Sequence, residues 1–276
     1  MPKQKILFIK LSIFTSLIFV FSSKTLIVGA ESLKPINPKL RFVAPQISHA
    51  GRPAGRRRGG ANRGDCPASE KRLTAIVPQT VIRDKGDDPI LSTWESVGGL
   101  TSVPNPSLLF YVPDELTKFT KDFVLQDESG TNIYKTSLTP SSTGSNFIQQ
   151  RISPTAVTLK PGKVYQWFFV VNCDPDAAPY VQGWIQRVTL SPSLKSQLQK
   201  ATLLQQAYLY ASNGIWYDAL NALAEGRRAK EQDANLLSSW ISLLDSVGLK
   251  AIATEPISGC CKPKQITNNN SKPISQ

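Results

Sequence analysis

The chain has 276 residues, a formal net charge of +12 and a single histidine. That histidine, His49, lies in a stretch rich in proline and glycine that would not hold it rigidly, so the sequence argues against Ser-His-Asp and Cys-His catalysis. The adjacent Cys260 and Cys261 lack histidine partners for zinc, and we predict neither a metal nor another cofactor.

Residues 1–30 have the features of a cleaved export signal. Lys3 and Lys5 precede an apolar run, and Val28-Gly29-Ala30 resembles a small-residue cleavage site. Lys10 shortens the apolar run to less than a membrane span, and an uncleaved N-terminal anchor is the alternative. Cleavage would lower the formal charge from +12 to about +8. We therefore expect an extracytoplasmic protein, periplasmic or secreted.

Residues 31–64 are predicted to be a disordered tether, because proline, glycine and arginine recur there without apolar periodicity. Its arginines are candidates for binding an anionic polymer or a membrane surface. They are Arg52, Arg56, Arg57, Arg58 and Arg63. No aromatic residues interleave with them to stack bases, and export also argues against nucleic acid as a partner.

Residues 65–190 alternate between short apolar runs and turn signals, which predicts an antiparallel β-sandwich of the immunoglobulin or fibronectin type. The predicted strands are 73–77, 107–112, 123–126, 133–138, 147–152, 156–159, 164–171 and 181–190. Residues 82–105 carry three glycines and two prolines, which indicates a long loop. Trp94 within this loop is a candidate contact for a partner.

The run Val164–Val171 is the predicted central strand, because apolar residues occupy both of its faces. The preceding Pro161-Gly162 turn and Tyr165 are similar to a tyrosine corner, in which the tyrosine hydroxyl bonds back to the turn backbone.

In an exported chain the four cysteines favour disulfides. Cys66 lies where the ordered region is predicted to start and Cys173 at the end of the central strand, so a bond between them would fix the chain's entry to the sheet. Free buried thiols at both positions are the alternative.

Residues 191–254 change to helical periodicity and predict three helices packed on the sandwich, which makes the fold class α+β. The first helix is expected to run unbroken from Leu194 to Ala211, and Asp233 is expected to cap the third. The segment from Tyr208 to Leu220 looks like a tetratricopeptide repeat. Residues 255–276 are expected to form a mobile tail.

Several sequence blocks occur together in one order: the arginine-glycine segment ending at Cys66, then 73–78, 110–113, 123–128, 165–173, 183–188 and 213–220. This combination resembles the exported cyanobacterial family catalogued as domain of unknown function 928. The resemblance covers nearly all of the mature chain. Where a typical member has arginine after the strand tyrosine, this chain has Gln166. The family's activity is unknown, so the resemblance implies no catalytic or binding residue.

Carboxylates supply the enzymatic alternative. The pairs Asp127-Glu128, Asp114-Glu115 and Asp174/Asp176 would serve a carbohydrate-active enzyme if they met across loops at glycosidase distances. Against this, Asp127 and Asp174 lie in turn sequences, where aspartate commonly bonds the backbone.

We expect instead a non-enzymatic, extracytoplasmic interaction or scaffold module. The sandwich would be its rigid body, and the helices or the long loop would contact an envelope or periplasmic protein. Binding of a polyanion or of the envelope through the arginines is a further alternative.

Overall fold

The structure is a computed structural model that describes residues 39–46, 52–60, 64–83, 93–139 and 146–257. All of them belong to one compact unit, residues 37–276. The predicted signal peptide, His49, Arg63, Cys260 and Cys261 lie outside the described residues. Within the described part of the chain, no helix has the length and apolar character needed to cross a membrane.

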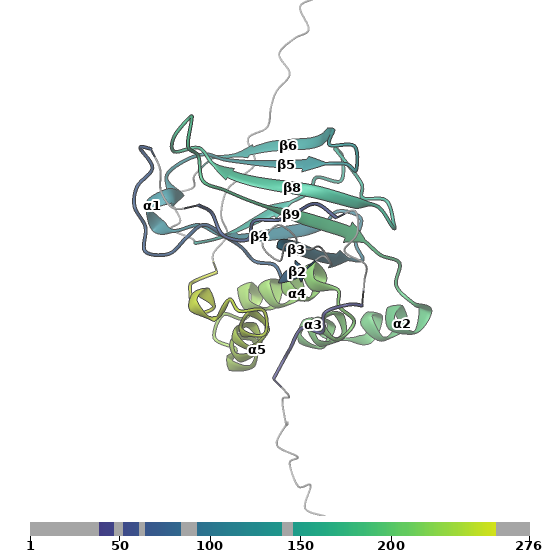
Figure 1. Ribbon diagram of the computed structural model, residues 1–276. Coiled ribbons are helices and arrows are strands. Elements are labelled where there is room, and N and C mark those ends of the chain that lie inside the picture. Colours follow the sequence, from purple (N-terminus) through teal and green to yellow (C-terminus); the bar gives the residue numbers. More distant parts are fainter. Residues whose placement is uncertain (1–38, 47–51, 61–63, 84–92, 140–145, 258–276) are drawn as a thin grey trace, which may run out of the picture. The chain divides into compact units, whose positions relative to one another are not determined.

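A six-stranded sheet forms the larger β-layer (Figure 1). Its strands, in spatial order, are β2 (Gln79–Arg83), β3 (Thr93–Thr101), β9 (Tyr180–Arg187), β8 (Val164–Val171), β5 (Lys121–Gln126) and β6 (Asn132–Leu138). All neighbours pair antiparallel except β3 and β9, which run parallel. The prediction of a wholly antiparallel fold is therefore wrong at this pairing.

A second, three-stranded sheet has the order β1 (Thr74–Ala75), β4 (Ser107–Tyr111) and β7 (Phe147–Arg151). The ring of Phe110 on β4 stacks on Phe169 of β8 with 4.1 Å between ring centroids, and it also contacts Trp167 edge-on. These aromatic contacts join the two sheets into one core. The predicted strand at 156–159 is wrong, since these residues form no strand.

Strand β8 is central, as predicted, because β9 and β5 flank it. Every second residue from Tyr165 to Val171 is buried, whereas the alternate residues from Val164 to Val170 are only half-buried. Only one of the two apolar faces is thus fully buried: the side chains of Trp167 and Phe169 pack on the small sheet, and the opposite face does not.

The described residues of the range 82–105 do not form a long loop, because most of them belong to β2 and β3, which pair with each other. Trp94 is a half-buried residue of β3, directly across from Ile82. Gly98, with φ of 151°, lets β3 approach β9 closely: a Cβ there would lie 2.1 Å from the Trp184 carbonyl oxygen. Glycine marks a close backbone contact here, not a flexible connection.

The helices follow the strands: α2 (Pro192–Lys200), α3 (Leu203–Ser212), α4 (Trp216–Ala229) and α5 (Ala234–Asp245), with the short α1 (Asp114–Thr117) earlier and a 3₁₀ turn at Lys250–Ile252. The expected continuous helix from Leu194 to Ala211 is broken between α2 and α3. Ala201 is extended, and Thr202 and Gln205 form a capping box that starts α3. Asp233 caps α5 as predicted.

Helix α4 is the most deeply buried helix, and it contacts β3, β4, α3 and α5. Trp216 Nε1 donates to the Ile76 carbonyl at 2.8 Å. The hydroxyl of Tyr217 accepts from Trp167 Nε1 and donates to the Trp184 carbonyl, both at 3.0 Å. Because these polar groups are paired, the large side chains are buried without a desolvation penalty, and they fix α4 on the sheets.

Residues 52–60, predicted to be part of a disordered tether, are instead paired with both sheets. Arg56 exchanges two backbone hydrogen bonds with Gln182 of β9, at 2.9 and 3.0 Å, and Gly55 N–H donates to the Glu95 carbonyl of β3 at 2.8 Å. Farther along, the segment bonds the backbone next to and within β1. The segment enters where β3 and β9 separate, so backbone pairing orders a stretch that has few apolar side chains.

Residues 39–46, called here the N-terminal strap, are also ordered, which contradicts the prediction of a disordered tether. Leu40 is 2 % exposed, and the ring of Phe42 meets Trp216 edge-on at 5.1 Å. Val43 N–H donates to the Ala211 carbonyl at 3.1 Å. A few inward apolar residues and paired backbone groups are enough to dock this extended strap on the helices.

Two local predictions are confirmed. A disulfide joins Cys66 to Cys173, whose Cα atoms are 5.2 Å apart. The backbone N–H of Lys160 donates to the Tyr165 hydroxyl at 3.0 Å, which is the bond expected for a tyrosine corner.

Candidate functional site

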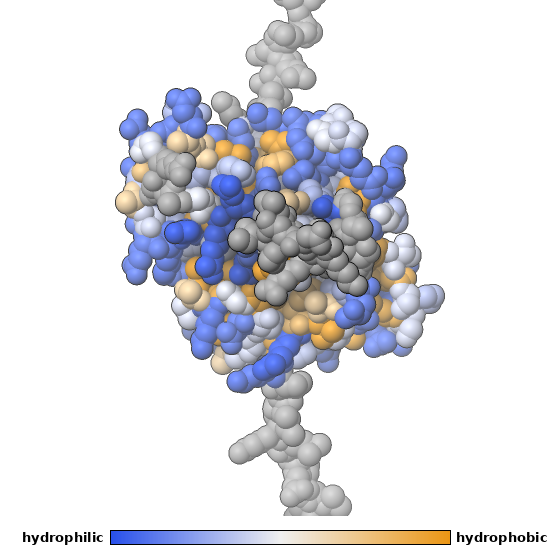
Figure 2. Space-filling view, viewed as in Figure 1, coloured by the Kyte–Doolittle hydropathy of each residue, from blue (hydrophilic) through white to orange (hydrophobic). Residues whose placement is uncertain are grey.

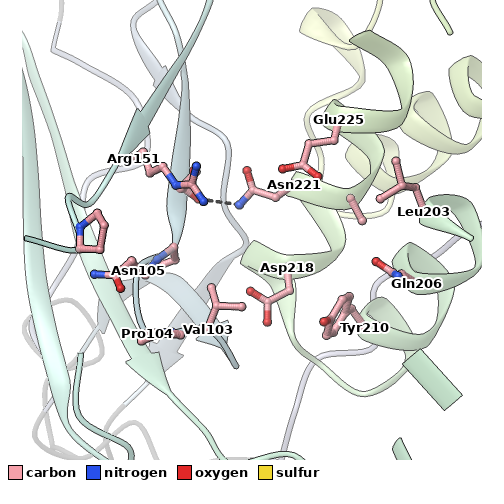
Figure 3. Close-up of a pocket in the computed structure, with 14 residues that line it drawn as sticks. Val103, Pro104, Asn105, Arg151, Leu203, Gln206, Tyr210, Asp218, Asn221 and Glu225 are labelled. Atoms are coloured by element: carbon pink, nitrogen blue, oxygen red, sulfur yellow. Dashed lines mark hydrogen bonds between the residues drawn. The ribbon is translucent and has the colours of Figure 1, made fainter. Parts of the chain in front are cut away.

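A groove of about 350 Å³ lies between α3, α4, the end of β7 and the loop 102–107 (Figure 3). Its wall residues include three prolines, which give the loops that carry them a fixed backbone. The lining residues used below are Asn105, Arg151, Gln206, Tyr210, Asp218, Asn221 and Glu225. We call this site the α3–α4 groove.

Asp218 forms the floor of the groove and is 6 % exposed. Its carboxylate accepts from the Thr101 hydroxyl at 2.7 Å and from the backbone N–H and hydroxyl of Ser102, both at 2.6 Å. Burial raises the pKa of Asp218, and the three donors oppose that rise. Burial and the nearby Asp218 carboxylate also raise the pKa of Tyr210. The floor is therefore a connected polar network that ties α4 to the end of β3.

Arg151 and Glu225 form the rim. Figure 3 shows their charged groups extending toward Asn221 from opposite sides. Both residues are exposed, and neither takes part in a salt bridge among the described residues. The Asn221 amide donates to the carbonyls of Ser107 and Tyr217 at 2.7 and 2.8 Å. Its N–H groups are therefore bonded within the protein and are not available to a ligand. One exposed cation and one exposed anion thus face the same opening, and Glu225 also interacts electrostatically with Arg228 on α4.

Helical spacing produces this arrangement. Asp218, Asn221 and Glu225 step by three and four residues along α4 and share one face, while Trp216 and Tyr217 point into the core. The polar positions on an otherwise apolar helix were visible in the sequence. What the sequence did not indicate is that Arg151, which is far away along the chain, lies opposite them.

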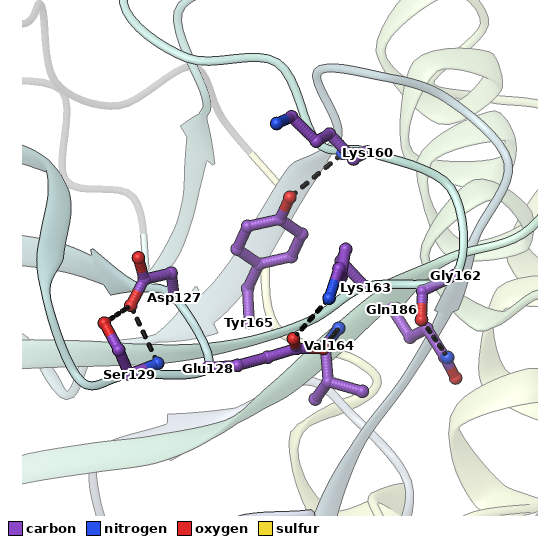
Figure 4. A network of polar contacts seen from close by, with 9 residues as sticks. All are labelled: Asp127, Glu128, Ser129, Lys160, Gly162, Lys163, Val164, Tyr165 and Gln186. Atoms are coloured by element: carbon purple, nitrogen blue, oxygen red, sulfur yellow. Dashed lines mark hydrogen bonds and ion pairs between the residues drawn. The ribbon is translucent and has the colours of Figure 1, made fainter.

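The carboxylates proposed for glycoside chemistry are each held by their own turn or by a neighbouring lysine (Figure 4). Asp127 accepts from the hydroxyl and N–H of Ser129, which lowers its pKa. Glu128 pairs with Lys163 at 2.8 Å and accepts from the Val164 N–H, and its pKa is lowered mainly by that lysine. A general acid needs a raised pKa, so this pair is suited to building the turn and not to donating a proton.

The other predicted carboxylates are similar. Asp174 accepts backbone N–H groups from Asp65, Asp176 and Ala177, and these bonds lower its pKa. It therefore organises the loops beside the Cys66–Cys173 disulfide. The pKa of Glu115 is lowered by its own backbone N–H at the start of α1.

The structure separates the arginines that were predicted to act together. Arg52 and Arg56 lie over the rings of Trp184 and Tyr180, at 4.7 and 4.5 Å from the ring centroids. Arg57 donates to the Val247 carbonyl at 2.7 Å, and Arg58 lines a different cavity. The face viewed in Figure 2 has strongly hydrophilic residues gathered left of its centre, with smaller apolar patches above and below them. The four described arginines therefore lie on the body of the fold with different neighbours and not on one disordered arm, and polyanion binding by them stays a prediction.

Metal ligation finds no support in the described ranges, where no three His, Cys, Asp or Glu side chains come close enough together to hold an ion. Asp127, Glu128, Asp174 and Glu115 instead have local backbone, hydroxyl or lysine partners.

The model of the family called Domain of Unknown Function (DUF928) matches residues 58–257. The chain belongs to the DUF928 family. No curated protein and no solved structure matches it. The DUF928 match includes every residue named in the α3–α4 groove and both cysteines of the disulfide, but it begins after the N-terminal strap. The family match therefore includes the candidate site but assigns it no role.

Proposed function

We propose that this DUF928 protein is a non-enzymatic interaction module that binds an extended segment of a partner protein in the α3–α4 groove. The observation that carries the proposal is the combination of a fixed floor, built on Asp218, with exposed opposite charges at the rim, Arg151 and Glu225. Such a site needs little rearrangement to bind, which reduces the entropic cost of association.

The chemistry of the rim suggests the chemistry of the partner. A segment with an acidic residue facing Arg151 and a basic residue facing Glu225 would be complementary to both charges. Asn105 and Gln206 also line the groove, and their amide nitrogens donate to the carbonyls of Val157 and Ala201, at 2.6 and 3.0 Å. Their amide oxygens are therefore the groups that suit the backbone N–H groups of an extended peptide. The partner would be an envelope or periplasmic protein if residues 1–30 direct export.

The proposal includes two assignments of fold type: tetratricopeptide-like helices and an immunoglobulin-like sandwich. The segment Tyr208–Leu220 resembles a tetratricopeptide repeat, and α3 and α4 pack together as a helical pair. Repeats of that kind use surfaces between helices to bind partners. An immunoglobulin-like sandwich would then serve as the rigid support, for which the tyrosine-corner bond at Tyr165 gives local support.

The carbohydrate-active alternative is less well supported. Its best pair, Asp127 and Glu128, consists of exposed carboxylates whose pKa values are lowered by local partners. Asp218 has a raised pKa, but it accepts three hydrogen bonds and has no second carboxylate among its bonded partners.

The proposal is tested by charge reversal at the rim. Arg151→Glu and Glu225→Lys are compared with Lys195→Glu on α2 and Glu231→Lys in the turn between α4 and α5, which make the same charge changes at exposed positions outside the groove. Tagged proteins are recovered from extracts of the native organism after crosslinking, and bound proteins are quantified by mass spectrometry. We expect a discrete partner that both rim variants lose by about tenfold or more and both controls keep. Equal recovery by all four variants would contradict the proposal.

A further inference from the structure

A second surface, unrelated to the groove, surrounds the turn that follows α5. Seven of the eight residues 245–252 line one or the other of two cavities. Asp245, Ser246 and Lys250 belong to a cavity of about 570 Å³, whereas Gly248, Leu249, Ala251 and Ile252 belong to one of about 240 Å³. The two hollows therefore adjoin along a single turn.

Cations from four separate parts of the chain converge on these cavities. They are Lys39 and Arg41 from the N-terminal strap, Arg58 from the arginine segment, Lys71 and Arg72 before β1, and Lys250 in the turn. We call these six residues the basic surface. Three carboxylates accompany them: Glu70 and Asp245 in the linings, and Glu255, which pairs with Lys71. The cations are thus in clear excess.

Most of these cations have no internal role. Lys71 is the only one of the six in a salt bridge among the described residues, and all six are exposed. Positive side chains near the end of a helix do complement its dipole, but Arg57 already supplies that interaction through the Val247 carbonyl. Burial and the neighbouring Arg58 lower the pKa of Arg57, which is a sign of crowded positive charge.

The backbone that carries the basic surface is fixed. Phe42 N–H donates to the Ser246 hydroxyl at 3.1 Å, which attaches the strap to the end of α5. Arg57 attaches the arginine segment to the same turn, and Trp240 Nε1 donates to the Ala253 carbonyl at 3.0 Å on its other side. The cations therefore extend from a rigid frame, with spacing set by the fold.

We propose that the basic surface binds a linear acidic polysaccharide, with carboxylate or sulfate groups held in the two cavities. Repeating negative charge suits two adjoining basic hollows, and the hydroxyls of Ser238 and Ser242 on the cavity wall suit sugar hydroxyls. Among the residues that the structure describes, no aromatic ring lines either cavity, so these cavities offer no base-stacking platform for nucleic acid. The side chains of Leu249 and Ile252 are buried and offer no apolar anchor for a bilayer.

The test compares two triple variants that remove equal charge. The site variant is Arg41→Gln, Arg58→Gln and Lys250→Gln, and the control is Lys160→Gln, Lys195→Gln and Lys200→Gln, at exposed lysines outside both cavities. Binding of the purified full chain to polygalacturonate, to a heparin-type sulfated polysaccharide, to neutral dextran and to phosphatidylglycerol vesicles is measured at several salt concentrations. The two acidic polymers distinguish carboxylate from sulfate as the bound group.

We expect salt-dependent binding of at least one acidic polysaccharide, weakened about tenfold in the site variant and less than about twofold in the control. Equal weakening in both variants would overturn the proposal, because it would reflect net charge alone. Binding to vesicles but to neither polysaccharide, or to no probe at all, would also overturn it. If the site variant is less stable than the control, Lys39→Gln with Arg72→Gln, one exposed cation from each cavity, replaces it.

Discussion

At the scale of single residues, the buried carboxylate of Asp218 shows how the groove is supported. It is almost fully buried, yet all the bonds described for it come from two adjacent residues at the end of β3. A buried acceptor with several donors contributes to stability mainly because its removal leaves those donors unpaired.

Asp218→Ala should therefore lower the free energy of unfolding by about 2–3 kcal/mol at neutral pH. Asp218→Asn keeps a side-chain oxygen that accepts from Ser102, so it should lower the free energy of unfolding by less than half as much. Because the folded-state pKa of Asp218 is raised, its protonation favours the fold, so wild-type stability should gain relative to the Asn variant as pH falls toward about 4. Urea unfolding of the wild type and of both variants at several pH values measures these differences in the free energy of unfolding. An Asn variant as unstable as the Ala variant at pH 7 would show that the ionised form is required.

Lys121 is a second buried titratable residue, 1 % exposed, whose ammonium group donates to the Thr117 carbonyl. Burial lowers its pKa to about 8. With a folded pKa below the unfolded value, its charged form destabilises the fold, and this effect disappears as pH rises from about 8 to about 10.4.

Lys121→Met should remove this pH dependence. Between pH 7.5 and 10 the free energy of unfolding of the wild type should rise by about 2–3 kcal/mol relative to that of the Met variant, as measured by urea unfolding. Lys160→Met, at an exposed lysine, is the control and should follow the wild type. Parallel profiles for wild type and Lys121→Met would contradict the assignment of a lowered pKa.

At the scale of elements, alternating patterns in the sequence predicted β4, β5, β6, β7, β8 and β9 near their observed positions. The failures have identifiable causes. The β2–β3 hairpin was interpreted as a loop because Gly98 and Gly99 weaken the strand pattern, although glycine is needed there for close approach to Trp184 and Trp216. The break before α3 did have a signal, since Thr202 and Gln205 have capping-box spacing.

The arginine segment is the largest correction at this scale. Its composition is typical of disorder, but its order depends on backbone pairing with β9 and on Arg57, whose partner Val247 is 190 positions away. Long-range backbone pairing of this kind leaves no local signature in the sequence.

Arg57→Gln should lower the free energy of unfolding by about 1–2 kcal/mol, because the charge-assisted bond at the end of α5 is lost. Arg56→Gln, whose side chain is exposed over Tyr180, should change it by less than about 0.5 kcal/mol. Thermal or urea unfolding distinguishes the two. A disordered tether would give no effect for either substitution.

At the scale of the whole molecule, the Cys66–Cys173 disulfide closes a loop of sequence separation 107 and attaches the N-terminal segment to β8. In the chain-entropy account, Cys66→Ser with Cys173→Ser should cost about 4–5 kcal/mol. Equilibrium unfolding of the oxidised wild type, the reduced wild type and the double variant measures it. Reduced wild type and double variant should agree, and a double variant as stable as the oxidised protein would exclude a structural role for the bond.

The candidate site was less predictable than the fold. The helices were expected to form a partner surface, but the groove depends on residues brought together from β7, α3, α4 and the loop 102–107. Arg151 was part of a predicted strand with no sign of a functional role, and its position opposite Glu225 follows from the packing of α4 on β4. Such a site emerges from topology and not from a motif.

If the α3–α4 groove binds an extended segment of a partner protein, a crosslinker placed in the groove should capture that segment. A photo-crosslinking amino acid is placed at Val103, an exposed groove residue whose replacement keeps both rim charges, or at Lys135, an exposed position on β6. After irradiation in the native organism, we expect one discrete adduct from position 103 that maps to a short continuous segment of a single protein. That adduct should be absent with Arg151→Glu and from position 135. Adducts of equal yield from both positions, or an adduct at 103 that persists with Arg151→Glu, would show that the groove does not bind such a segment.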